Sequence, residues 1–153
     1  ADPVEADLAK ETTALLEEAR NSYGREHRLT ATLPGPLLLR TDPVLYRSVC
    51  ENLLENACKY SPKGSQVHVE LSSGAGSVRF SVQDNGPGIP LEDRQRIFEK
   101  FVRGGNEETR DTKGTGLGLF IVRRLMETLG GRVEYRPVLP QGSTFTALFP
   151  LHP

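Results

Sequence analysis

The chain has 153 residues, of which 37% are hydrophobic and 25% are charged, and its formal net charge at pH 7 is −1. These values fit a soluble globular protein, and without an excess of basic residues they argue against general binding to nucleic acid or membrane surfaces. No apolar run approaches the ~20 residues that cross a bilayer, and no signal-peptide pattern opens the chain. We therefore expect one cytoplasmic domain that covers residues 1–153.

The N-terminal third is predicted to contain one helix and two short strands. Residues 1–7 show no structural pattern and are interpreted as a linker or a cloning remnant. Apolar residues then recur at helical spacing over residues 8–26. Residues 27–33 and 37–40 are predicted strands on either side of a loop that two prolines enforce. The second strand begins with three consecutive leucines and is expected to be buried.

A second helix is predicted to start at Asp42, where an N-cap carboxylate is followed by a proline at the first helical position. The helix carries an apolar stripe and ends near Ser61. Cys50 and Cys58 both fall in this helix, about 12 Å apart along its axis at 1.5 Å per residue. A disulfide cannot span that distance, so both are predicted to be small core residues.

The second half of the chain alternates strands with helical segments. Residues 67–71 and 78–82 have apolar side chains at every second position, which predicts a β-hairpin with one buried face. The remaining predicted elements are a turn from Asp84 to Pro90, a short helix around Phe98, a polar lid over about 103–113, a helix that ends at Gly130, and strands over 132–136 and 144–149. This order predicts an α+β fold: a two-layer sandwich of a mixed β-sheet packed against about three helices.

Two features of the sequence suggest polar chemistry. Asn52 and Asn56 lie four residues apart and therefore share one helix face, which is costly to bury without partners. Gly114, Gly116 and Gly118 allow the backbone to approach a ligand closely, and the N-terminus of the following helix attracts anions. Each feature alone has a simpler interpretation, as a solvated helix face or as a glycine-rich turn before a core helix.

Taken together and in order, these segments resemble the ATP-binding domain of sensor histidine kinases, which belongs to the superfamily of DNA gyrase, Hsp90 and MutL-type ATPases. The matching segments are Asn52–Pro62 (N box), Asp84–Pro90 (G1 box), Arg96–Arg103 (F box), Gly114–Leu119 (G2 box) and Gly142–Phe145 before the last strand. The resemblance covers the chain from about residue 8 to its end. It implies a mixed sheet backed by three helices, with ATP held between a helix and a mobile lid.

The resemblance also implies roles for individual residues. Asn56 is the implied Mg²⁺ ligand, and Arg103 is implied to stabilise charge on the γ-phosphate, so these two are the candidate catalytic residues. Asp84 is implied to accept a hydrogen bond from the exocyclic amine of adenine. The implied contacts to the nucleotide are Asn52, Asn56, Lys59, Tyr60, Asp84, Gly86, Gly88, Ile89, Lys113, Gly114, Thr115, Gly116, Leu117, Gly118 and Thr144.

The same comparison separates a kinase from an ATPase. The ATPase branches of the superfamily place a water-activating glutamate where this chain has Asn52, and an amide cannot take a proton at neutral pH. We therefore expect transfer of the γ-phosphoryl group to an external histidine, with ATP and Mg²⁺ as the cofactors. A nucleotide-binding interaction module without transfer activity and a stand-alone ATPase are the alternatives.

The phosphoacceptor is expected on another domain. His27, His68 and His152 are the only histidines; none has the sequence context of a kinase phosphoacceptor, and all are predicted surface residues. The expected partners are therefore a helical dimerisation and phosphoacceptor domain of the same kinase and, downstream, a response regulator. The isolated domain is expected to be monomeric and the full-length protein a homodimer, with membrane anchoring outside this segment left open.

Overall fold

The computed structural model describes residues 2–99 and 118–151. Within these ranges the elements, in chain order, are β1 (Val4–Asp7), α1 (Leu8–Arg20), β2 (Arg28–Thr32), β3 (Leu38–Thr41), α2 (Pro43–Tyr60), β4 (Gln66–Gly74), β5 (Ser77–Asp84), the 3₁₀ turn η1 (Leu91–Asp93), α3 (Gly118–Thr128), β6 (Arg132–Pro137) and β7 (Ser143–Pro150). A five-stranded sheet has the order β2-β4-β5-β7-β6. In it β2 and β4 are parallel, and the other neighbours are antiparallel.

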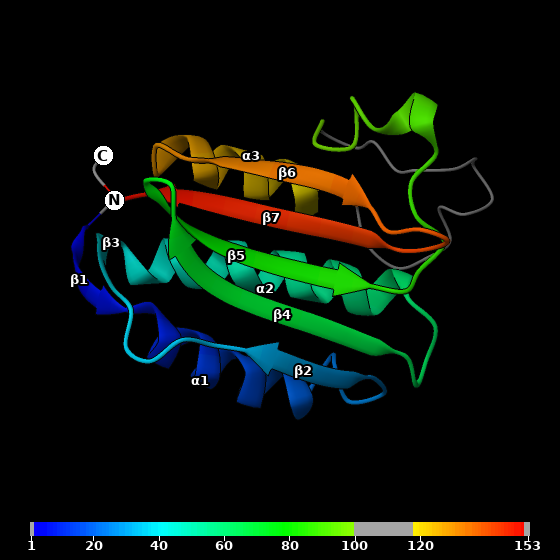
Figure 1. Ribbon diagram of the computed structural model, residues 1–153, viewed down its shortest axis with the longest axis horizontal. Coiled ribbons are helices and arrows are strands. Elements are labelled where there is room, and N and C mark those ends of the chain that lie inside the picture. The colour runs from blue at the N-terminus through cyan, green and yellow to red at the C-terminus, as the bar shows by residue number, and fades with distance from the viewer. Residues whose placement is uncertain (1, 100–117, 152–153) are drawn as a thin grey trace.

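The three helices all cover one face of this sheet, which confirms the predicted α+β two-layer sandwich (Figure 1). Helix α2 lies in the middle, between α1 and α3. Its start is the predicted one, because Asp42 accepts hydrogen bonds from two backbone N–H groups of the first turn and Pro43 follows. Its apolar stripe, with Val49 and Leu53 fully buried, packs against the sheet. The face that carries the polar residues is therefore fixed by the packing of the opposite face.

The predicted hairpin is β4–β5, and its register explains where the site residues lie. The apolar residues of both strands face the helices, and Tyr46 of α2 packs its ring edge-on against Phe80, with ring centroids 6.3 Å apart. Alternate residues of β5 are buried up to its last residue, Asp84. A carboxylate thus ends a row of apolar side chains, on the helix-covered face of the sheet.

The expectation that residues 1–7 form a linker is wrong for Val4–Asp7. These residues form β1, which pairs antiparallel with β3 apart from the main sheet. The prediction of a buried strand at the leucine run is also wrong: Leu38 is 56% exposed, and only Leu39 of β3 is a buried leucine. A two-stranded ribbon has only one side to pack against the core, so alternate residues of β3 remain in solvent.

Two predicted helices differ in extent. The first ends at Arg20 rather than at residue 26, and hydrogen-bonded turns follow it. Around Phe98 the described residues form η1 and further turns, with Ile97 buried, rather than a regular helix. The two predicted C-terminal strands are confirmed as β6 and β7, which pair antiparallel, and α3 ends as predicted before Gly130, which has a φ of 79°. No helix in the described ranges is both long and apolar enough to cross a membrane.

Candidate functional site

The C-terminal half of α2 presents the polar face that the sequence predicts. Asn52 and Asn56 are half-buried, whereas Lys59 and Tyr60 in the last turn are exposed. The Asn52 amide nitrogen donates to the carbonyl oxygen of Ser48 at 2.7 Å, which fixes the orientation of its side chain. No hydrogen bond joins the Asn56 amide to another residue of the described ranges, so its oxygen is available as a ligand.

Asp84 ends β5 as a buried carboxylate with 4% of its surface exposed. Its Oδ1 accepts a hydrogen bond from the backbone nitrogen of Gly86 at 2.7 Å. Burial raises the pKa of Asp84 above its ordinary value, while backbone N–H groups of Gly86 and Ser143 act in the opposite direction. The carboxylate is thus held in a fixed position and partly desolvated, which suits recognition of a hydrogen-bond donor.

The turn after Asp84 packs directly against the end of α2. A Cβ atom added to Gly86 would lie 2.7 Å from the carbonyl oxygen of Tyr60, a distance that real Cβ atoms essentially never show. Gly88 has a φ of 81°, a conformation that favours glycine, and a Cβ there would lie 3.4 Å from the carbonyl oxygen of Gly142. The turn therefore passes between α2 and the β6–β7 hairpin, and Ile89 packs against the core.

The first residue of α3 completes the arrangement. A Cβ added to Gly118 would lie 3.7 Å from Asn52 Oδ1, so the described end of the glycine loop lies beside the polar face of α2. Helices α2 and α3 are also in contact with each other. The structure thus brings together three segments that are far apart in the sequence: the α2 face, the Asp84 turn and the start of α3. The predicted site residues among them are Asn52, Asn56, Lys59, Tyr60, Asp84, Gly86, Gly88, Ile89 and Gly118.

Thr144 is the predicted residue that the structure does not bring to this site. Thr144 pairs with Gln83 and Ser143 pairs with Asp84, and directly opposed residues of antiparallel strands point to the same face. Thr144 therefore points to the uncovered face of the sheet, and Ser143, which is 5% exposed, lies beside Asp84. The sequence does carry a signal for Ser143: it is two residues before the core residue Phe145, and residues two apart in a strand point to the same face of the sheet.

A second missed residue is Tyr135 of β6. Its hydroxyl accepts hydrogen bonds from the backbone nitrogen of Ile89, at 3.2 Å, and from Ser143 Oγ, at 3.3 Å. The sequence gives no signal for this contact, because it depends on the register of β6 against β7 and on the path of a distant turn.

Several predicted residues lie outside the described ranges: Arg103, Lys113, Gly114, Thr115, Gly116 and Leu117, with the rest of the predicted lid. Within the described ranges, no group of three or more His, Cys, Asp or Glu side chains could hold a metal ion. The amide oxygen of Asn56 is a hard oxygen donor, the ligand type that Mg²⁺ takes together with oxygen atoms of water and phosphate.

The two described histidines are hydrogen-bonded within the fold. Both ring nitrogens of His68 lie within hydrogen-bond distance of threonine hydroxyls of β2, at 2.7 and 3.1 Å. His27 Nε2 lies 3.2 Å from the carbonyl oxygen of Ser61. Both are partly buried, so the prediction of plain surface positions holds only in part, and His152 lies outside the described ranges.

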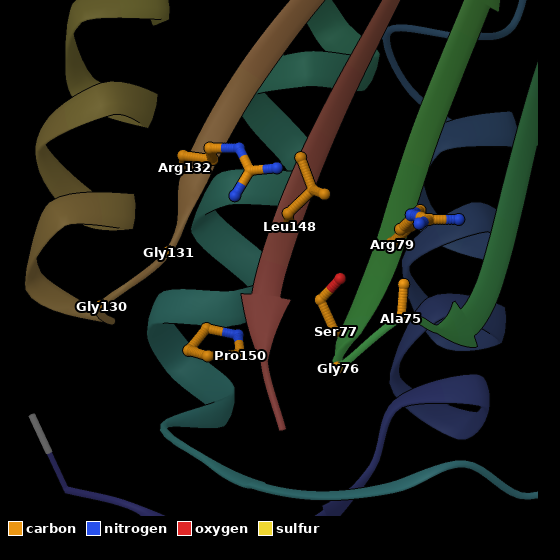
Figure 2. Close-up of a pocket in the computed structure, with 9 residues that line it drawn as sticks. All are labelled: Ala75, Gly76, Ser77, Arg79, Gly130, Gly131, Arg132, Leu148 and Pro150. Carbon is orange, nitrogen blue, oxygen red and sulfur yellow. The ribbon is translucent and has the colours of Figure 1, made fainter. Parts of the chain in front are cut away.

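A hollow of about 330 Å³ lies elsewhere, at the opposite end of the sheet (Figure 2). It is lined by Ser77, Arg79, Arg132 and Leu148, among other residues, and by none of the predicted site residues. Ser77 and Asp84 are the two ends of β5, so the hollow and the carboxylate are about 23 Å apart at ~3.3 Å per residue. The hollow is therefore separate from the site.

Comparison with known proteins gives concordant matches. The family model described as "Histidine kinase-, DNA gyrase B-, and HSP90-like ATPase" matches residues 41–153. The chain is 52% identical to the sensor histidine kinase AruS of Pseudomonas aeruginosa over 103 residues, which cover 65% of this chain and 10% of AruS. AruS and the other sensor proteins that match are much longer than this chain, which spans from 10% to 33% of their length.

Solved structures match the fold closely. The mycobacterial sensor histidine kinase MprB superposes with a TM-score of 0.81 at 29% identity, with 99% of each chain covered. Full-length ShkA in complex with AMPPNP superposes with a TM-score of 0.82 at 32% identity, with 97% of this chain and 31% of ShkA covered.

Proposed function

Because this chain belongs to the histidine kinase-, DNA gyrase B- and HSP90-like ATPase family, we propose that it binds Mg²⁺–ATP and donates the γ-phosphoryl group to a histidine of a separate domain. The observation that carries the proposal is the convergence of the Asn52–Asn56 face of α2, the Asp84 turn and the start of α3. The AMPPNP bound to ShkA, which has the same fold, supports a nucleotide as the ligand.

The base would be recognised at the Asp84 turn. The exocyclic amine of adenine donates a hydrogen bond, whereas guanine has an acceptor at the corresponding position, so a fixed carboxylate favours adenine. Gly86 and Gly88 let the turn pack closely against the carbonyl oxygens of Tyr60 and Gly142, which sets the path of the backbone beside the carboxylate. Ser143, in register with Asp84, adds a hydroxyl next to the carboxylate.

The phosphates would lie along the polar face of α2. Bound Mg²⁺ would neutralise phosphate charge and orient the phosphates for in-line transfer. The half-buried Asn56 amide would supply one neutral oxygen ligand, and Lys59 would supply a positive charge one turn further along the helix. Arg103 is proposed to stabilise charge on the γ-phosphate, with Lys113 and the glycine loop closing the phosphate end.

The acceptor would be external, because the α2 face offers no base to activate water. The hydrogen bond from Asn52 to Ser48 fixes an amide, which cannot accept a proton, beside the start of α3. Glu55 is exposed on another part of the helix surface. Positioning and charge neutralisation would then account for the chemistry that this chain contributes.

The whole protein is proposed to be a homodimeric two-component sensor kinase. The acceptor histidine would lie on its dimerisation and phosphoacceptor domain, and the phosphoryl group would pass on to a response regulator. Residues 1–153 would form one catalytic domain that is monomeric in isolation, acts in the cytoplasm and belongs to a protein that is anchored in a membrane. The names of the longer relatives, among them a sensor histidine kinase and a sensor protein, support a sensor kinase as the whole protein.

Incubation with γ-labelled ATP tests the function. The expected result is nucleotide binding with slow phosphate release by the chain alone, and labelling of a purified histidine-containing phosphoacceptor domain when that domain is added. Rapid release of phosphate without an acceptor would favour the stand-alone ATPase. Binding with neither release nor transfer, across several acceptor domains, would favour the nucleotide-binding module.

A further inference from the structure

The peptide backbone of Ile89 is held from both sides by side chains of other segments. Its N–H donates to the Tyr135 hydroxyl at 3.2 Å, and its carbonyl oxygen accepts from Arg94 Nε at 3.0 Å. The Arg94 guanidinium lies 5.7 Å from the centroid of the Tyr135 ring, within the range of a cation–π contact. One tyrosine and one arginine therefore hold the same residue and also contact each other.

The position of Tyr135 is itself fixed by packing. Its ring packs against the ring of Phe145 of β7, with centroids 5.2 Å apart. The ring of Phe98 in turn packs edge-on against Phe145, with centroids 6.1 Å apart. Ser143 Oγ donates to the Tyr135 hydroxyl at 3.3 Å, and Ser143 is the register partner of Asp84. The hydroxyl thus connects both flanks of the Asp84 carboxylate: the turn that follows it and the strand beside it.

The start of the turn is held by the hydrogen bonds from Gly86 N to Asp84 and from Gln141 to the Asn85 carbonyl oxygen, so Tyr135 and Arg94 support its second half. Residues 85–90 belong to no helix or strand, and Gly88 bends the chain in a conformation with a φ of 81°. Glycine permits this bend but does not enforce it, since it loses more backbone entropy on ordering than other residues do. Side chains must therefore select the conformation, and Tyr135 and Arg94 contact the turn where it leaves Gly88.

We propose that Tyr135, assisted by Arg94, is a positioning residue that holds the Ile89 backbone and the Ser143 hydroxyl in the arrangement that receives the nucleotide base. This inference rests on the proposed nucleotide-binding function. Tyr135 acts through Ile89 and Ser143 and does not itself contact the phosphates. Its contribution is pre-organisation, because a turn ordered before binding loses less entropy when the ligand arrives.

The test is Tyr135→Phe, which removes only the hydroxyl. We expect the dissociation constants of ATP and ADP, measured by calorimetry, to rise by the same factor of about five, the effect of one neutral hydrogen bond. Equal factors are expected because both nucleotides carry the same base. In the nucleotide-free protein, the Ile89 amide proton should move upfield in the NMR spectrum. Unchanged affinity, or a loss confined to ATP, would overturn the proposal.

Tyr46→Phe is the matched control, because it also removes one phenolic hydroxyl that is hydrogen-bonded, here to Thr12 at 2.7 Å. This change should lower the melting temperature and leave nucleotide affinity unchanged. Arg94→Gln should weaken affinity as well, and its effect should not add to that of Tyr135→Phe, since the two residues contact each other and hold the backbone on either side of Ile89 Cα. Additive effects would overturn the pairing.

Different results would exclude the proposed function and the positioning role of Tyr135. If the unsubstituted chain binds neither ATP nor ADP, the proposed function fails. If it binds both and Tyr135→Phe binds them equally well, only the positioning role fails. The Ile89 amide shift tests the hydrogen bond without any nucleotide.

Discussion

Asp7 and Asp42 perform the same two tasks at opposite ends of one strand pair. Asp7 caps α1 by accepting from Ala9 N, and it also accepts from the backbone nitrogen of Leu37 at 3.1 Å. Asp42 caps α2 by accepting from Val44 N, and it also accepts from the backbone nitrogen of Asp2 at 2.8 Å. Each carboxylate therefore starts a helix and holds the opposite strand. Through Asp42, the N-terminal segment is joined to the helix that carries Asn52 and Asn56.

Replacing Asp42 should therefore destabilise the protein in a pH-dependent way. The hydrogen bond from the Asp2 N–H, with those from Leu45 and Val44, lowers the pKa of Asp42. A lowered pKa means that the stabilisation is complete above the unfolded value of about 3.9 and is lost as the pH falls through the lower folded value. The melting temperature of Asp42→Ala should thus lie below that of the unsubstituted chain at pH 7, and the two should converge in acid.

Asp2→Ala is the matched control for this change, because the Asp2 contact to Asp42 uses the backbone nitrogen and survives the substitution. Its melting temperature should follow that of the unsubstituted chain at every pH. A gap between Asp42→Ala and the unsubstituted chain that stays constant down to pH 2 would contradict the carboxylate mechanism.

Asp84→Asn should weaken ATP binding without lowering the stability of the nucleotide-free protein. Because burial raises the pKa of Asp84, its contribution to stability is greatest below the unfolded value of about 3.9 and is lost as the pH rises through the folded value. At pH 7 the nucleotide-free variant should therefore melt at the same temperature as the unsubstituted chain or higher. Its ATP affinity should fall, since the new amide group would present an N–H donor to the exocyclic amine of adenine, which is also a donor. Calorimetry and melting curves from pH 3 to 8 measure both effects, and full ATP affinity would refute the base contact.

Asn56→Ala should abolish Mg²⁺-dependent transfer and leave the fold intact. Loss of a metal ligand should reduce transfer to an added phosphoacceptor domain by about 100-fold or more. Glu55→Ala is the control on the same helix, since Glu55 is exposed and one residue away. Transfer by this control should be unchanged. A fall in ATP hydrolysis in Glu55→Ala would instead identify a water-activating role and favour the ATPase alternative.

Gly86→Ala should disturb the contact between the Asp84 turn and α2. The added Cβ would lie 2.7 Å from the Tyr60 carbonyl oxygen, so the turn must move. Overpacking of this kind costs about 1–3 kcal/mol, and denaturant titration should detect it together with weaker ATP binding. At Gly35 nothing lies within 4 Å of an added Cβ. Gly35→Ala should therefore change stability by less than about 0.5 kcal/mol; equal effects of the two substitutions would contradict the packing argument.

Ser143→Ala and Thr144→Ala together test which hydroxyl of β7 serves the site. Ser143 shares a face with Asp84, whereas Thr144 shares one with Gln83. We expect Ser143→Ala to weaken ATP binding several-fold, as the loss of about 1 kcal/mol would, and Thr144→Ala to leave it unchanged. The opposite result would return the role to Thr144.

Much of the fold could be predicted because its signals are local. The N-cap at Asp42, the alternation of Val78, Phe80 and Val82, and the stop at Gly130 each depend on residues within one or two turns of the chain. The predicted strand β3 illustrates the limit. Its extended conformation was predictable, but its partner was not, since β1 lies more than 30 residues away and shows no pattern of its own.

By itself the sequence determined which residues are candidates for the proposed nucleotide site: the amides of α2, the carboxylate at the end of β5 and the glycines of the two turns. Only the tertiary structure decided which of them meet. The pairing of Asp84 with Ser143 rather than Thr144, and the contact of Tyr135 with Ile89, depend on strand register and on the path of a turn. The physical reason is that local backbone preferences are set by neighbours along the chain. Register is instead selected by the burial of many side chains at once, so that a shift by one residue would turn every side chain of a strand to the other face.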